Sequence, residues 1–139
     1  MDGKQTDLNK QIVRRFNLEV IQNGSREAFD ALMQGDFANH SAVPPRNDKE
    51  SMWNTFNTIL RPGFRDLQVE IHDQVAEGDL VTTRKTIHGT HTGAFMGLPP
   101  TGKRVAIQVI DIVRLKDNRY SEHWGLNTFE KVLSELKTN

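Results

Sequence analysis

The residue with the clearest capacity for chemistry is an aspartate inside an apolar strand. Asp111 follows Val109 and Ile110 and precedes Ile112 and Val113. A carboxylate in such a segment is costly to bury unless it is paired or lines a wet cavity. Asp111 is therefore a candidate base, although a structural hydrogen bond or a place at a solvated edge would also explain it. Burial would raise its pKa toward neutrality, which suits proton abstraction beside a carbonyl.

Whether Asp111 meets a histidine depends on the turn at Asp117-Asn118. A bulged type I turn there sets Asp111 opposite His123, and the two side chains would form a catalytic dyad. A two-residue turn instead sets Asp111 opposite Trp124 and moves His123 to the other face, because one residue of slip reverses a strand. We favour the bulged turn, because it separates a polar-lined face from an apolar one.

Composition excludes several other chemistries. The 139 residues contain no cysteine, and Lys plus Arg and Asp plus Glu both number 18. A neutral chain without thiols argues against nucleic acid, an anionic membrane and thiolate metal sites as the basis of function. His88 and His91 lie three apart in a predicted strand and so face opposite ways, and we expect no metal site. Phosphate-loop, zinc-protease and serine-hydrolase motifs are missing.

The elements that would position Asp111 and His123 follow from hydrophobic periodicity. Apolar residues repeat at helical spacing from Leu8 to Ile21 and again after candidate caps at Ser25, Asp48 and Thr128. Alternating residues predict strands at 67–72, 80–88, 105–115 and 120–126. The second helix would end at Gly35, followed by an irregular stretch over 36–47. Helices followed by hairpins predict one α+β domain over 1–139, with N-terminal helices packed on a curved antiparallel sheet.

Several segments resemble one known family, the SnoaL-like polyketide cyclases, over roughly residues 8–136. The most specific are GTHTGAFMGLPPTGK at 89–103 and the EHW of Glu122 to Trp124. Further matches are DIVRLKDNR at 111–119, FRDL at 64–67 and EGDLV at 77–81. The resemblance implies a cone-shaped fold like that of nuclear transport factor 2 and ketosteroid isomerase, a homo-oligomer and a deep apolar pocket.

The resemblance also implies the reaction of this family, which is cofactor-free ring closure by intramolecular aldol condensation with an aspartate as base. That aspartate is expected just after the EHW segment, where this chain has Gly125, and a second frequent acidic position is Asn127. Asp111 and His123 would then take over proton transfer. Two alternatives are a non-catalytic binding protein with the same pocket, and epoxide hydrolysis to which Arg84 and Asp111 would contribute.

The expected ligand is an apolar, carbonyl-bearing small molecule. Trp53, Phe56 and Phe64 could wall its cavity, while His40 and the 92–102 loop with Met96 would border the mouth. The complete set of predicted substrate contacts is His40, Trp53, Phe56, Arg84, His91, Met96, Gly125 and Asn127.

The chain is expected to act in the cytoplasm as a homodimer or higher homo-oligomer. Its polar N-terminus lacks the apolar core of a signal peptide, and no apolar run approaches the ~20 residues of a membrane span. The outer sheet face would be too apolar to stay in water. Its predicted members are Ile110, Ile112, Tyr120, Trp124 and Leu126.

Overall fold

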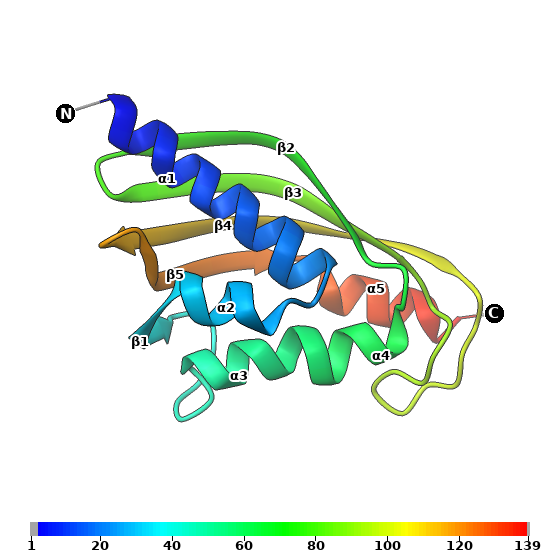
Figure 1. Ribbon diagram of the computed structural model, residues 1–139. Coiled ribbons are helices and arrows are strands. Elements are labelled where there is room, and N and C mark those ends of the chain that lie inside the picture. The colour runs from blue at the N-terminus through cyan, green and yellow to red at the C-terminus, as the bar shows by residue number, and fades with distance from the viewer. Residues whose placement is uncertain (1–2, 139) are drawn as a thin grey trace.

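Five strands form one sheet, and the helices of the N-terminal half lie across one of its faces (Figure 1). The computed structural model describes residues 3–138. The strand order is β1-β5-β4-β3-β2, and every neighbouring pair is antiparallel except β1 and β5. The strands are β1 Met33–Asn39, β2 Gln68–Glu77, β3 Leu80–Thr90, β4 Arg104–Lys116 and β5 Arg119–Asn127. The predicted α+β class is confirmed.

The helices after Ser25, Asp48 and Thr128 begin where predicted, whereas α1 begins earlier than the predicted Leu8, at Gly3. The helices are α1 Gly3–Arg15 continued by the π-helix η1 Phe16–Gln22, α2 Arg26–Leu32, α3 Lys49–Asn54 continued by η2 Thr55–Leu60 and α4 Arg61–Gly63, and α5 Phe129–Leu136. Ser25 and Asp48 are N-caps, and their side-chain oxygens accept backbone N–H bonds from Ala28 and Ser51. Thr128 makes no cap bond to its helix and accepts instead from the Gln108 backbone.

Strand β1 was not predicted, because the sequence analysis ended a helix at Gly35 and left 36–47 irregular. The strand runs parallel to β5, and its register shifts between Met33 and Ala38, so it shows no regular alternation. A pairing this irregular leaves no period-2 signal in the sequence. Its consequence for the site is direct, since it places Asn39 beside His123.

The β4–β5 turn differs from the favoured one. Asp117 and Asn118 both have positive φ, 51° and 63°, and lie between the paired Lys116 and Arg119, which makes a two-residue type I′ turn. The extra residue comes later, because Leu115 pairs with Tyr120 whereas Arg114 pairs with Glu122. Ser121 is thus the bulged residue, and the bulge shifts the register of the rest of β5 by one.

Because of this bulge, Asp111 and His123 still share a face as predicted, although the turn is not the predicted one. Beyond it, Asp111 pairs with Gly125 and Val113 pairs with His123, so Asp111 and His123 lie on the same face. The predicted shared face is therefore confirmed, whereas the predicted direct opposition of the two residues is not.

The outer sheet face is apolar, with one correction. Ile110, Ile112 and Leu126 are 53%, 36% and 82% exposed. Tyr120 lies before the bulge and so turns inward, where it is buried and stacks on Phe16 with ring centroids 4.3 Å apart. The remaining apolar face still favours self-association.

We predict that this face forms a homodimer. Replacing Leu126 by arginine should weaken the dimer, because it places a charge where apolar area would be buried. Light scattering at micromolar concentration checks this. A monomeric wild-type mass would contradict it, and an unchanged dimer in Leu126→Arg would contradict the choice of face.

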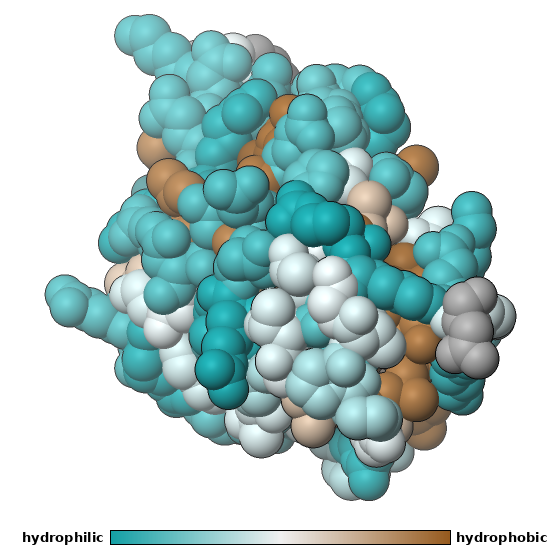
Figure 2. Space-filling view, turned by 90° about the vertical axis from the view of Figure 1, so that its right-hand side faces the viewer, coloured by the Kyte–Doolittle hydropathy of each residue, from teal (hydrophilic) through white to brown (hydrophobic). Residues whose placement is uncertain are grey.

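No helix among residues 3–138 is long and apolar enough to cross a bilayer. The end of the molecule that carries the 92–102 loop is mostly hydrophilic, with apolar atoms gathered in a few places (Figure 2).

Candidate functional site

A cavity of about 300 Å³ lies between the α3–η2 helix and the inner face of β3, β4 and β5. Most of its walls are apolar, and its ionisable members are Lys85, Asp111 and His123. The other lining residues are Asn39, Ser41, Ala42, Met52, Thr55, Phe56, Ile59, Leu60, Ile87, Ile107, Val109, Gly125, Asn127 and Phe129. An apolar cavity with a few convergent polar groups is the usual form of a small-molecule site.

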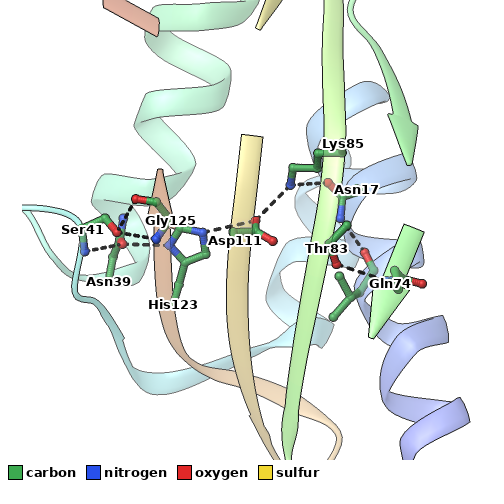
Figure 3. Close-up of polar contacts among 10 residues, drawn as sticks. Asn17, Asn39, Ser41, Gln74, Thr83, Lys85, Asp111, His123 and Gly125 are labelled. Atoms are coloured by element: carbon green, nitrogen blue, oxygen red, sulfur yellow. Dashed lines mark hydrogen bonds and ion pairs between the residues drawn. The ribbon is translucent and has the colours of Figure 1, made fainter. Parts of the chain in front are cut away.

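Asp111 is held by a buried ion pair (Figure 3). The Nζ of Lys85 is 3.1 Å from Asp111 Oδ2, and the two side chains are only 5% and 7% exposed. Lys85 Nζ also donates to Asn17 Oδ1 at 2.6 Å. The Asn17 amide nitrogen donates to the backbone oxygen of Val13, which fixes which end of the amide faces Lys85. The lysine is therefore held at a defined position.

His123 continues the same chain of contacts from the other side. Its Nε2 lies 3.3 Å from Asp111 Oδ2, and its Nδ1 lies 2.9 Å from Asn39 Oδ1. The backbone N–H of Ser41 donates to that Asn39 oxygen, which identifies the oxygen as an acceptor. Nδ1 of His123 must then carry a proton to make its bond. A residue of β1 thus fixes Nδ1 as a hydrogen-bond donor in a histidine of β5.

The pKa of Asp111 lies below its ordinary value. Burial raises it, but the Lys85 charge and the hydrogen bond from His123 lower it by more. The expectation of a pKa raised toward neutrality is therefore wrong, because the sequence analysis did not place a lysine in the site. An ionised Asp111 of low pKa is a weak base. Its other oxygen, Oδ1, is enclosed and has no hydrogen-bond partner within residues 3–138.

Gly125 provides the space that His123 occupies. It pairs with Asp111, and a Cβ built on it would lie 2.9 Å from His123 Cε1 and 3.4 Å from Asp111 Cβ. Its backbone N–H donates to Ser41 Oγ, and that hydroxyl donates to its carbonyl oxygen. These bonds tie the loop after β1 to β5 beside the cavity.

We predict that Gly125→Ala displaces the His123 ring, because Asn39 and Asp111 hold that ring at both nitrogens. Overpacking of this kind costs about 1–3 kcal/mol. Thermal unfolding measures the cost, and NMR of the imidazole reports the displaced ring. Unchanged ring resonances would show that the space beside Gly125 is not limiting. Gly78→Ala is the wrong control, since Gly78 needs a positive φ; Gly35→Ala suits better, because its Cβ meets nothing within 4 Å.

Arg84 and His40, two predicted contacts, do not line the cavity, because each is paired with a carboxylate outside it. Arg84 belongs to the opposite face of β3 and pairs with exposed Asp73 at 2.8 Å. His40 stacks on Trp124, with ring centroids 4.9 Å apart, and its Nε2 lies 2.8 Å from Glu122. Both side chains are occupied by partners outside the cavity.

Three further predicted contacts also lie outside the lining. Trp53 packs on Phe29, with ring centroids 5.2 Å apart. His91 is fully buried and holds the loop through Thr101, whose backbone N–H donates to its Nδ1. Met96 is 58% exposed.

The 92–102 loop does not border the cavity. Its apolar anchor Phe95 packs edge-on against Phe64 and Phe129, and only Phe129 of these three lines the cavity. The prediction that this loop borders the pocket mouth is therefore wrong, and the loop is a structural corner between β3 and β4. Phe64, which was expected as a possible cavity wall, is instead a buried core residue outside the lining.

Five predicted residues do line the cavity: Phe56, Asp111, His123, Gly125 and Asn127. Asn127 also uses its side-chain oxygen to accept from the Phe129 backbone N–H at the start of α5. No cluster of three or more metal-ligating acidic, histidine or cysteine side chains occurs within residues 3–138.

Comparison with known proteins identifies the family. The sequence model of the SnoaL-like polyketide cyclases matches residues 11–133. The chain belongs to this family. Its helices on a curved, mostly antiparallel sheet are accordingly the nuclear transport factor 2-like fold. A search of curated proteins found no significant match.

Solved structures similar to this SnoaL-like chain carry different descriptions. IdmH of Streptomyces antibioticus, a putative polyketide cyclase, is 26% identical, with a TM-score of 0.81 over 94% of this chain and 99% of its own. AclR of Streptomyces galilaeus, a putative hydroxylase, is also 26% identical, with a TM-score of 0.81 over 94% and 82%. A putative SnoaL-like cyclase from Jannaschia sp. CCS1 reaches 0.85 over 100% and 98%, at 23% identity.

Four residues that complete the site of this SnoaL-like protein were not predicted from the sequence: Asn17, Asn39, Ser41 and Lys85. A signal for Lys85 was present, because Val81, Thr83, Lys85 and Ile87 alternate along β3 and are all buried. The alternation places Lys85 inside and Arg84 outside. Asn39 and Ser41 carry no such signal, since their position depends on the irregular β1 pairing.

Proposed function

We propose that this SnoaL-like protein catalyses cofactor-free proton transfer on an apolar small molecule that carries a carbonyl group, with His123 exchanging the proton. One observation carries the proposal: His123 lies at the polar end of an apolar cavity, held between the acceptors Asn39 Oδ1 and Asp111 Oδ2. Both acceptors stabilise the imidazolium that forms when the ring takes a proton.

The proposed reaction begins with neutral His123, protonated at Nδ1, after the bound substrate has displaced the Nε2 atom from its contact with Asp111 Oδ2. Its Nε2 takes a proton from the carbon beside a carbonyl, and the electron pair of the broken C–H bond moves to the carbonyl oxygen as an enolate. The enolate carbon attacks a second carbonyl of the same molecule, a C–C bond forms, and the new alkoxide takes the proton back from His123. Atoms and charges balance, and no co-reactant is consumed.

Asp111 acts in this scheme through His123. Its low pKa keeps it ionised, so its negative charge is available to the imidazolium throughout the cycle. The Asp111 side chain is 7% exposed and the His123 side chain is 16% exposed, so a ligand can reach the histidine more easily. This reverses the roles first expected, in which Asp111 was the base and His123 its partner.

A non-catalytic binding function is the second candidate. It is favoured by Gly125, which stands where the family resemblance places the catalytic aspartate, and by a cavity whose imidazole is already bonded at both nitrogens. Epoxide hydrolysis has less support, because within residues 3–138 no carboxylate other than Asp111 lines the cavity and Arg84 lies outside it.

The two candidates are separated by a turnover screen. Linear aromatic 1,3-diketones with a further carbonyl placed for six-membered ring closure would be incubated with the protein and followed by mass spectrometry. We expect a cyclised isomer of unchanged mass, separated from the substrate by chromatography, or the same product after spontaneous loss of one water, formed faster than in buffer. Tight binding of these compounds with no product from any of them would favour the binding function.

A further inference from the structure

Lys85 is a buried side chain of the cavity that has an unused hydrogen-bond donor. We infer that the cavity binds its ligand through an anionic oxygen, a carboxylate or an ionised enol, held by the Lys85 ammonium. The inference deepens the proposed function and rests on it in taking this cavity as the ligand site. It adds the ionic form of the ligand and the residue that selects it.

The first support is the donor count of Lys85. An ammonium has three N–H donors. Two of them have partners, Asn17 Oδ1 at 2.6 Å and Asp111 Oδ2 at 3.1 Å, and residues 3–138 provide no third acceptor. The side chain is 5% exposed and lines the cavity. A buried donor without a partner is costly, and a ligand oxygen would satisfy it.

The second support is the charge of the cavity. The Lys85 and Asp111 charges cancel, and within residues 3–138 no other carboxylate lines the cavity to repel an anion. The surroundings are apolar, where the Lys85 ammonium interacts with an opposite charge more strongly than in water.

The third support is the shape of the remaining wall, which limits the kind of anion. Phe56, Ile59, Leu60, Ile107 and Val109 present hydrocarbon to the ligand. A phosphate has several charged oxygens and needs many donors, which these residues do not supply. A ligand with one anionic group on an apolar body would place the anionic group at Lys85 and the body against these hydrocarbon side chains. An ionised enol is such a group, and it is also the intermediate of the proposed reaction.

Calorimetric titration with naphthoate and naphthamide tests the inference, because the two probes have nearly the same shape and differ in charge. Wild-type protein is expected to bind naphthoate at least tenfold more tightly. Lys85→Met/Asp111→Asn removes one positive and one negative charge, so the charge sum is kept and the Lys85 donor is lost. Its preference for naphthoate should fall at least fivefold.

The matched control is Arg84→Met/Asp73→Asn, which removes the neighbouring ion pair on the outer face and should keep the wild-type preference. Asp111→Asn alone removes the acceptor that competes for Lys85, so its preference should exceed that of wild type. Circular dichroism confirms folding of each variant, and the Asp111→Asn result keeps the inference testable if the double variant does not fold.

Equal wild-type affinities for the two probes, or no binding of either, would overturn the inference. An undiminished preference in the folded double variant would overturn the role of Lys85. The result is independent of turnover: a strong naphthoate preference without any cyclised product would reject the proposed reaction alone, and product formation without that preference would reject this inference alone.

Discussion

Lys85→Met is expected to destabilise the protein by about 3–5 kcal/mol, because it leaves the Asp111 carboxylate buried without a counter-charge. Urea unfolding at neutral pH measures the loss. In the double variant Lys85→Met/Asp111→Leu most of the stability should return, because an apolar pair replaces a buried ion pair at little cost. Arg84→Met breaks an exposed pair on the same strand and should change stability little.

The pH dependence of this effect has a defined sign. The native pKa of Asp111 lies below the ordinary value of 3.8, so its pair contributes stability above about pH 4 and loses it as pH falls through the native pKa. The difference in unfolding free energy between wild type and Lys85→Met should therefore be largest at neutral pH and become smaller in acid. A difference that grows in acid would show that Asp111 is not ionised in the native protein.

His123→Gln is expected to lower turnover by about 10²–10⁴-fold, the usual contribution of a general acid–base group. Glutamine can still hydrogen-bond Asn39 and nearly fills the same space, so KM should change little while kcat falls. Steady-state kinetics on whichever diketone is cyclised gives both values. His40→Gln is the matched control, since His40 lies outside the cavity lining and pairs with Glu122.

An equal loss in His123→Gln and His40→Gln would indicate a general effect on the fold. A normal kcat in His123→Gln would reject His123 as the proton-exchanging residue.

The sequence predicted the elements whose patterns are local. The apolar stripe from Leu8 to Ile21 identified the first helix, and alternation identified β2 to β5. The shared face of Asp111 and His123 was also predicted, although the residue that produces it is the bulge at Ser121 rather than the turn. A bulge inside a strand leaves little sequence signal, whereas its effect on side-chain direction reaches every later residue.

Apart from Phe56 on η2, the site was predicted only where it depends on β4 and β5. Lys85 could have been found from strand alternation, but the more exposed Arg84 was chosen in its place. Asn39 reaches His123 through a parallel pairing over 84 residues of sequence, which no local pattern encodes. The error in the Asp111 pKa followed from missing Lys85, because desolvation was considered without the charge that outweighs it.

The most direct test of the account is whether the cavity removes a proton from carbon. β-Tetralone, a small apolar ketone with acidic protons beside its carbonyl, would be incubated with the protein in D₂O and its proton signals followed by NMR. We expect exchange well above the buffer rate with wild type and His40→Gln, and exchange at the buffer rate with His123→Gln. Wild-type exchange no faster than buffer, or equally fast exchange with His123→Gln, would contradict it.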